Sequence, residues 1–153
     1  MHRTLVRLAA TAMTLAAGIV IVGAGSASAE TELPMTRCLG PSPFIVDQPY
    51  APARLWVEQN ESGTVTLALR DVASLWFFAG GYQSQARLDW RNPATGASGT
   101  EFTTQLVGYP GGQPGRFHFV SGPGPVELTL SAFNWHALWG VPSTSCTGVV
   151  QVR

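Results

Sequence analysis

Short runs of alternating apolar and polar residues, separated by turns rich in glycine and proline, constrain the fold of this chain more than any other feature. The alternation is clearest in residues 64–70, 85–92 and 125–131, where every second side chain is apolar. Such a period places the apolar side chains on one face of a β-strand. Between the runs lie typical turn sequences such as NESG and SGPGP. No segment shows the 3.6-residue period of an amphipathic helix.

Five further segments have a strand-like composition with less regular alternation: 54–59, 74–79, 100–107, 116–120 and 148–152. Many short strands without intervening helices predict an all-β fold, an antiparallel immunoglobulin-like β-sandwich of about 7–8 strands. A small β-barrel is the alternative, because strands have the same period in both architectures.

The first 29 residues have the layout of a secretory signal peptide. Arg3 and Arg7 precede an apolar run, and the small residues 26–29 follow it. We therefore expect cleavage after Ala29 and export of a single, monomeric domain over residues 30–153 with no stable membrane span. An uncleaved membrane anchor is the alternative, because the apolar run is just long enough to cross a bilayer.

The mature segment carries little charge and contains no lysine. Its seven arginines stand against nine carboxylates, which gives a formal net charge of −2. Nucleic-acid binding draws most of its affinity from clustered basic side chains, and this segment has no basic run. We therefore expect no nucleic-acid partner.

Cys38 and Cys146, the two cysteines of the chain, lie near the two ends of the mature segment. An oxidising compartment favours their pairing, and a bridge across so long a loop stabilises by about 4–5 kcal/mol on the chain-entropy model. It would pin the proline-rich lead-in 30–52, in which residues 44–46 are a candidate edge strand. We expect no metal site, because two distant thiols and two histidines at unrelated positions do not make a ligand set.

One hairpin resembles a known group of proteins. Trp90, Asn92, Thr95, Gly96 and Gly99 form a Trp-x-Asn-x-x-Thr-Gly-x-x-Gly pattern, and a Gly-Pro-Gly turn with a following strand comes later in the chain. The pattern resembles small secreted actinobacterial proteins. The resemblance implies an exported immunoglobulin-like β-sandwich with two terminal cysteines, and it brings no catalytic residues with it.

No catalytic constellation can be assembled from these residues. The only mature histidines are His118 and His136, and no serine stands in a Gly-x-Ser-x-Gly context. His118 alternates with two phenylalanines, so we expect it to face solvent beside Arg116. Asp89 shares a strand face with arginines at 87 and 91, which predicts a surface ion-pair ladder. The glycine-rich loops contain prolines and lead into strands, so we expect no phosphate-bearing cofactor.

The stretch FNWHALW, residues 133–139, is the strongest candidate for a binding site. We expect the preceding strand to end near Phe133, and Trp135 and Trp139, four apart, to share one side of a helical turn. This turn either caps the open end of the sandwich or presents an exposed aromatic surface, which is typical of interaction sites. Trp135, His136 and Trp139 are the candidate binding residues.

These observations together favour a secreted, non-enzymatic binding or structural protein of the cell envelope or extracellular space. Its partner would be a protein, a glycan or an apolar ligand, and no cofactor is expected. The alternative from another class is a small secreted hydrolase that uses His136 or His118 with an acidic partner. A structural or toxin-like factor that acts by oligomerising is a third reading.

Overall fold

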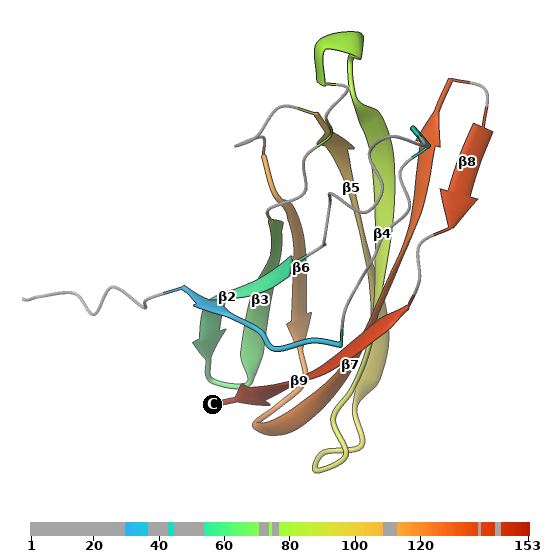
Figure 1. The fold of residues 1–153 in the computed structure, drawn as a ribbon. Coiled ribbons are helices and arrows are strands. Elements are labelled where there is room, and N and C mark those ends of the chain that lie inside the picture. The colour runs from blue at the N-terminus through green and yellow to red at the C-terminus, as the bar shows by residue number, and fades with distance from the viewer. Residues whose placement is uncertain are drawn as a thin grey trace, which may run out of the picture.

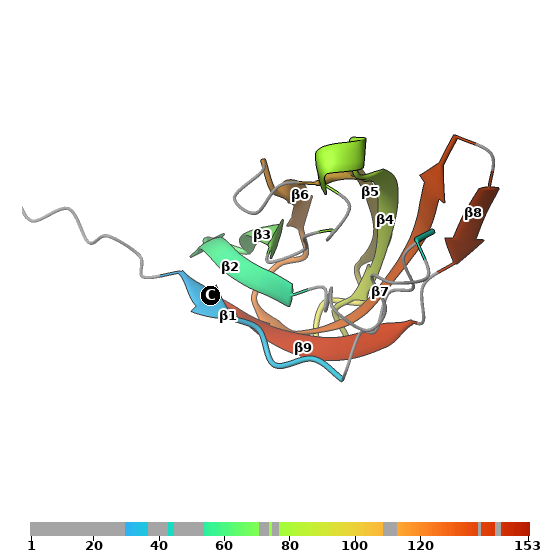
Figure 2. The same cartoon turned by 45° about the horizontal axis from the view of Figure 1, so that its top comes forward.

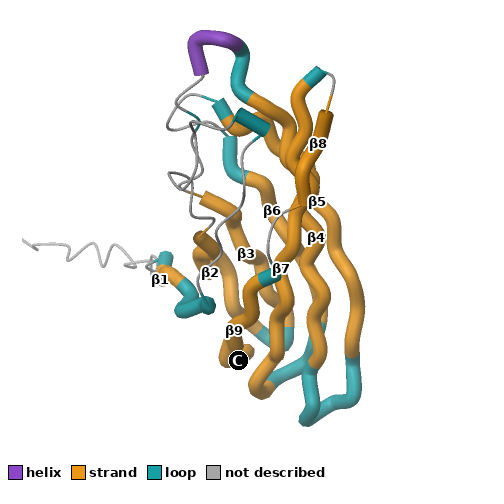
Figure 3. Tube along the Cα trace, turned by 45° about the vertical axis from the view of Figure 1, so that its right-hand side comes forward, coloured by secondary structure: helices purple, strands orange, loops and turns teal. Residues whose placement is uncertain are grey.

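The computed structural model describes residues 30–36, 43–44, 54–70, 74, 77–108, 113–137, 139–142 and 145–153. Strands dominate this part of the chain, and one short 3-10 helix lies at one end of the molecule (Figures 1 and 3). In chain order the elements are β1 (Thr31–Glu32), β2 (Arg54–Glu61), β3 (Thr64–Arg70), η2 (Phe77–Ala79), β4 (Tyr82–Arg91), β5 (Ser98–Val107), β6 (Gly115–Val120), β7 (Gly124–His136), β8 (Trp139–Pro142) and β9 (Cys146–Val152).

The strands form two antiparallel sheets that face each other (Figure 2). The first sheet has the order β1-β2-β3-β6, and the second has the order β5-β4-β7-β8, with β9 also paired to β7. The 13-residue strand β7 makes both pairings possible, because its first half pairs with β9 and its last four residues pair with β8. The predicted all-β, antiparallel sandwich is confirmed at this level.

The core lies between the sheets and is built from the alternating residues that the sequence singled out. Trp90 stacks on Phe119 from the opposite sheet, with ring centroids 4.8 Å apart and planes 14° apart. The three clean alternations are confirmed as buried faces. In β3, however, the face expected to be polar also has two buried residues, Thr66 beside His118 and Ala68. The inward residues of the three runs are Val65, Leu67, Leu69, Ala86, Leu88, Trp90, Val126, Leu128 and Leu130.

Both open sides of the sandwich are closed by contacts between the sheets. On one side, β5 side chains cover the edge of β6, where Gln105 Oε1 accepts the backbone N–H of Gly115 at 2.8 Å. On the other side, the N-terminal segment pairs first with β2 and then with β9. The Leu33 N–H donates to Leu55 in the first sheet at 2.8 Å, and the Thr36 N–H donates to Thr147 in the second at 2.9 Å.

The hairpin that carries the resemblance is bonded to a second turn far away in sequence. Asn92 is fully buried between the two turns. Its Nδ2 lies 2.9–3.1 Å from the backbone carbonyl oxygens of residues 121–123, and its Oδ1 accepts the Ala94 N–H at 2.9 Å. Thr95 Oγ1 donates to the first of these carbonyls at 2.8 Å. The two expected local turns therefore form one hydrogen-bonded cluster at this end of the sandwich.

The strand predicted over 74–79 is wrong for the residues of it that the structure describes: 77–79 form η2, and Ser74 belongs to no strand. Gly80 and Gly81 follow with φ of 91° and 66°, a conformation that glycine adopts without strain. A Cβ at Gly81 would lie 2.2 Å from the Val107 carbonyl oxygen, so the chain reverses tightly against β5 before β4 begins. Residues 75–76 of that prediction lie outside the described residues, as do residues 45–46 of the candidate edge strand and the predicted signal peptide.

Candidate functional site

The stretch FNWHALW forms a β-hairpin, and the predicted helical turn is wrong. Strand β7 continues past Phe133 to His136, and β8 begins at Trp139. The register pairs Trp135 with Gly140 and His136 with Trp139. The strand continues because its residues stay paired with β4: Phe133 lies opposite Gln85, and Trp135 lies opposite Gln83. The alternation therefore persists to the end of β7, although it is hard to see among so many aromatics. Ala137, with φ of 40°, begins the tight turn.

The hairpin and β4 form an open hollow of about 470 Å³ on the surface. Phe133 and Trp135 lie next to each other in its lining, with ring centroids 6.2 Å apart and planes within 27° of parallel. The side chain of Trp139 is 56% exposed and that of Phe133 is 47% exposed. The residues that line the hollow are Gln85, Phe133, Trp135, Ala137 and Trp139.

Two contacts hold the aromatic rings of the hollow in place. A Cβ built on Gly140 would lie 2.5 Å from Cζ of Phe133, so the phenylalanine ring lies directly over this glycine. The indole Nε1 of Trp139 donates to the backbone carbonyl of Pro43 at 2.9 Å. These contacts restrict the rings of Phe133 and Trp139 before any ligand arrives, which lowers the entropy lost on binding.

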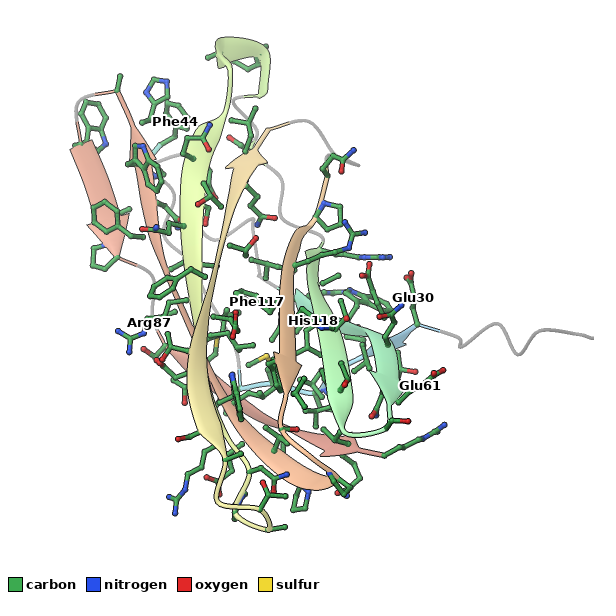
Figure 4. All side chains as sticks on the ribbon, turned by 180° about the vertical axis from the view of Figure 1, so that it is seen from behind. Glu30, Phe44, Glu61, Arg87, Phe117 and His118 are labelled. Atoms are coloured by element: carbon green, nitrogen blue, oxygen red, sulfur yellow. The ribbon has the colours of Figure 1, made fainter. Side chains whose placement is uncertain are left out.

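The structure separates the three predicted binding residues. Trp135 and Trp139 line the hollow. His136 packs instead against Phe44, which Figure 4 labels, with ring centroids 4.8 Å apart. His136 is half-buried and does not line the hollow. Of the two alternatives predicted for this stretch, an end cap or an exposed aromatic surface, the side chains of Trp139 and Phe133 fit the exposed surface, whereas the half-buried His136 packs against Phe44.

The two histidines proposed for the alternative hydrolase lie on different sheets. His118 is exposed on β6, as expected, and its Nδ1 lies 2.9 Å from Thr66 Oγ1. Within the described ranges, no hydrogen bond or ion pair joins either imidazole to a carboxylate. No group of three or more possible metal ligands is found among the described residues. That part of the chain also contains no helix long and apolar enough to cross a bilayer.

A charged network occupies the outer face of the first sheet. Glu58 lies at an irregularity in the pairing of β2 with β3, and its carboxylate accepts from Arg116 Nε at 2.8 Å and from Arg70. The hydrogen bond from Arg116, followed by that from Arg70, holds the pKa of Glu58 below its usual value. Arg70 also pairs with Glu30. Two carboxylates here balance two guanidinium groups, so the network holds the sheet edge together and offers no uncompensated charge to a ligand.

The predicted ion-pair ladder on β4 is reduced to one pair. Arg87 donates to Asp89 through Nε at 3.1 Å and Nη2 at 2.8 Å. This guanidinium, with a further hydrogen bond from Thr100, lowers the pKa of Asp89. Arg87 also lies 6.0 Å from the centre of the Phe102 ring. Arg91 joins no ion pair among the described residues.

Three residues of the hollow, Gln85, Phe133 and Ala137, were not among the predicted site residues. Phe133 belongs to the candidate stretch 133–139, but it was expected to end the preceding strand. Gln85 opens one of the clean alternations, where it appears as an ordinary solvent-facing position. Its place beside Phe133 follows from the register of β4 against β7, which period alone does not determine.

Comparison with known proteins adds no relative to this description. No protein-family model, no curated protein and no solved structure matches the chain.

Proposed function

We propose that this chain is a secreted, non-enzymatic binding protein and that the hollow of the β7–β8 hairpin is its contact surface. The observation that carries the proposal is the pair of nearly parallel rings, Phe133 and Trp135, on an open surface beside the exposed Trp139. Burying aromatic rings is the main source of affinity in many interfaces, and exposed aromatic clusters are uncommon unless they bind something.

The strand order supports an immunoglobulin-like type of sandwich. If β2, β3, β4, β6, β7 and β9 correspond to strands A, B, C, E, F and G, the first sheet contains A-B-E and the second contains C-F-G. Strand β5 then pairs with C in the second sheet, where immunoglobulin variable domains also add strands. In such domains the strands form a rigid frame, and binding residues lie at its ends and surfaces.

The packing of the N-terminal segment supports the proposed disulfide between Cys38 and Cys146. Met35 forms a β-bridge with Gly148, and Thr36 is hydrogen-bonded to Thr147, so the antiparallel segment runs toward Cys146. Cys146 is buried on β9, and no free cysteine is found in the described residues. Cys38 itself lies outside those residues, so the pairing stays a prediction that a mass measurement can test.

The binding proposal is tested with residues 30–153 and the double variant Trp135→Ala/Trp139→Ala. Retention of each protein on immobilised cell-envelope extract of the producing organism is measured at equal concentration. We expect the double variant to lose most of the retention. Phe78→Ala is the matched control, because Phe78 is 71% exposed on η2 and does not line the hollow. Circular dichroism and urea unfolding establish that each variant is folded.

Equal retention of the double variant and the parent domain would refute the assignment of this surface. The expected export is tested separately by expressing the whole chain and determining the N-terminus of the protein in the medium, which the proposal places at Glu30. Light scattering during size-exclusion chromatography tests the proposed monomer.

A further inference from the structure

We propose that the ligand of the hollow is a neutral polysaccharide chain, whose sugar rings stack on Phe133 and Trp135 while Gln85 hydrogen-bonds their hydroxyl groups. This inference rests on the proposed function and names its ligand class. Its starting point is the chemistry of the lining, which combines three aromatic rings, one primary amide and one methyl group.

The charge of the lining favours a neutral ligand. None of the side chains described as lining the hollow is charged. Arg87, two residues after Gln85 on β4, is already hydrogen-bonded to Asp89 and lies against the Phe102 ring. A phosphate, a sulfate or an acidic peptide would give up its hydration here without gaining a partner charge.

The pairing of rings with an amide matches the two chemical faces of a sugar. A pyranose presents C–H groups above and below its ring and hydroxyl groups around its edge. The C–H groups carry partial positive charge and are attracted to the negative face of an aromatic ring. The Gln85 side chain is exposed and next to Phe133 in the register, and it offers two N–H donors and one carbonyl acceptor to hydroxyl groups.

The geometry of the rings suits a ligand of several flat units. Phe133 and Trp135 are two residues apart on one strand face, and their planes are within 27° of each other. In the proposed complex, neighbouring sugar rings of one chain each contact one of these two rings. The hollow is open along the surface, so the interior of a long chain can pass through it without a free end.

The size and polarity of the surroundings argue against the other two ligand classes. A stable protein interface buries about 800 Å² on each partner, and a partner of that size centred here would also cover the Arg87–Asp89 pair. A purely apolar ligand would bury the Gln85 amide without a hydrogen bond, which is unfavourable. At about 470 Å³ the hollow lies within the usual range of small-ligand sites, about 300–1,000 Å³.

The experiment measures how far residues 30–153 are retarded in native gels that contain soluble starch, xylan, galactomannan or arabinogalactan, together with pull-down on insoluble cellulose and chitin. We expect retardation or pull-down by at least one of these glycans, with little change between low and high salt. Trp135→Ala is expected to weaken this binding by at least about tenfold. Gln85→Leu is expected to weaken it by about two- to tenfold, the effect of losing one or two hydrogen bonds.

Gly140→Ala tests the position of the ring without removing an aromatic side chain. The new methyl group would overlap Cζ and Cε1 of Phe133, at 2.5 and 2.6 Å, and the exposed ring can swing away. The methyl group would also lie 3.1 Å from the Asn134 carbonyl oxygen, so we expect weaker glycan binding with a small loss of stability and a folded domain. This variant keeps the test meaningful if Trp135→Ala fails to fold, and Phe78→Ala is again the control.

The outcomes separate this inference from the proposed function. If the envelope extract retains the domain through Trp135 and Trp139 but none of these glycans binds, the surface stands and the glycan is refuted. The same conclusion follows if protease treatment of the extract, rather than periodate oxidation of its sugars, removes retention. Glycan binding that is unaffected by both Trp135→Ala and Gly140→Ala refutes the placement of the sugar on this surface.

Discussion

Replacing Asn92 by alanine should destabilise the sandwich strongly, although the residue lies far from the hollow and in a turn. The side chain has two N–H hydrogens for three carbonyl oxygens, so we count two good donor bonds, and the bond from Ala94 at 2.9 Å is a third. At about 1 kcal/mol each, these bonds contribute about 3 kcal/mol.

The carbonyl groups that lose Asn92 are affected unequally. Residue 121 keeps the hydroxyl of Thr95 at 2.8 Å, and residue 122 keeps the hydroxyl of Ser121 at 3.0 Å. Only the carbonyl of Pro123 has no second donor among the described residues, which adds about 1 kcal/mol. We therefore expect Asn92→Ala to lower the free energy of unfolding by about 3–4 kcal/mol, measured by urea denaturation with tryptophan fluorescence.

Asn92→Asp is the matched variant, because it keeps the shape and the acceptor oxygen but turns a second oxygen toward the three carbonyl groups. Repulsion should raise the pKa of this carboxyl in the folded state. A carboxyl whose pKa is raised in the folded state destabilises the fold at pH values above its pKa in the unfolded chain. Asn92→Asp should therefore gain stability relative to Asn92→Ala as the pH falls. A loss below about 1 kcal/mol for Asn92→Ala, or parent-like stability of Asn92→Asp at pH 7, would refute the role given to these bonds.

Three shorter predictions follow from other contacts. Glu58→Gln should lower the free energy of unfolding by about 1 kcal/mol at pH 7, because the ionised carboxylate stabilises the fold at pH values above its unfolded pKa. The difference between the variant and the parent should disappear as the pH falls through the lowered pKa of Glu58, which urea unfolding curves at several pH values can check. Gly99→Ala should cost about 1–3 kcal/mol by the same assay, because its methyl group would lie 2.8 Å from the buried Trp90 indole, which has no room to move. The intact mature domain should be 2 Da lighter than its reduced form if Cys38 and Cys146 are paired, and reduction should lower its stability by about 4–5 kcal/mol.

The fold was predictable wherever one face of a strand is apolar and the other polar. Residues 85–92 and 125–131 show this pattern, and the structure buries the expected side chains there. The errors lie where the pattern fails. In residues 74–79 neighbouring aromatics obscure the period, and the glycine pair that ends η2 determines the local structure. Strands β1 and β8, of two and four residues, are too short for any period to show.

The candidate site was predictable in location but not in membership. The density of aromatics pointed to Trp135 and Trp139, and both line the hollow. Which side of the hairpin each residue faces depends on the length of β7, so His136 could not be separated from its neighbours. Gln85 joins the site because the register of β4 against β7 places it opposite Phe133. The sequence does not say which strands pair or in which register, so this neighbour could not be predicted.

The pairing of the N-terminal segment with β9 also has a kinetic consequence. Thr36 and Thr147 meet although they are 111 positions apart, and Asn60 holds the Gln151 carbonyl from 91 positions away. The two sheets cannot close until the final strand has reached both of them. When native contacts join residues this far apart in sequence, the chain loses much conformational entropy before the contacts form and stabilise it. We therefore expect folding in about milliseconds to seconds. Such a chain stays unfolded for longer than a helical protein of the same size.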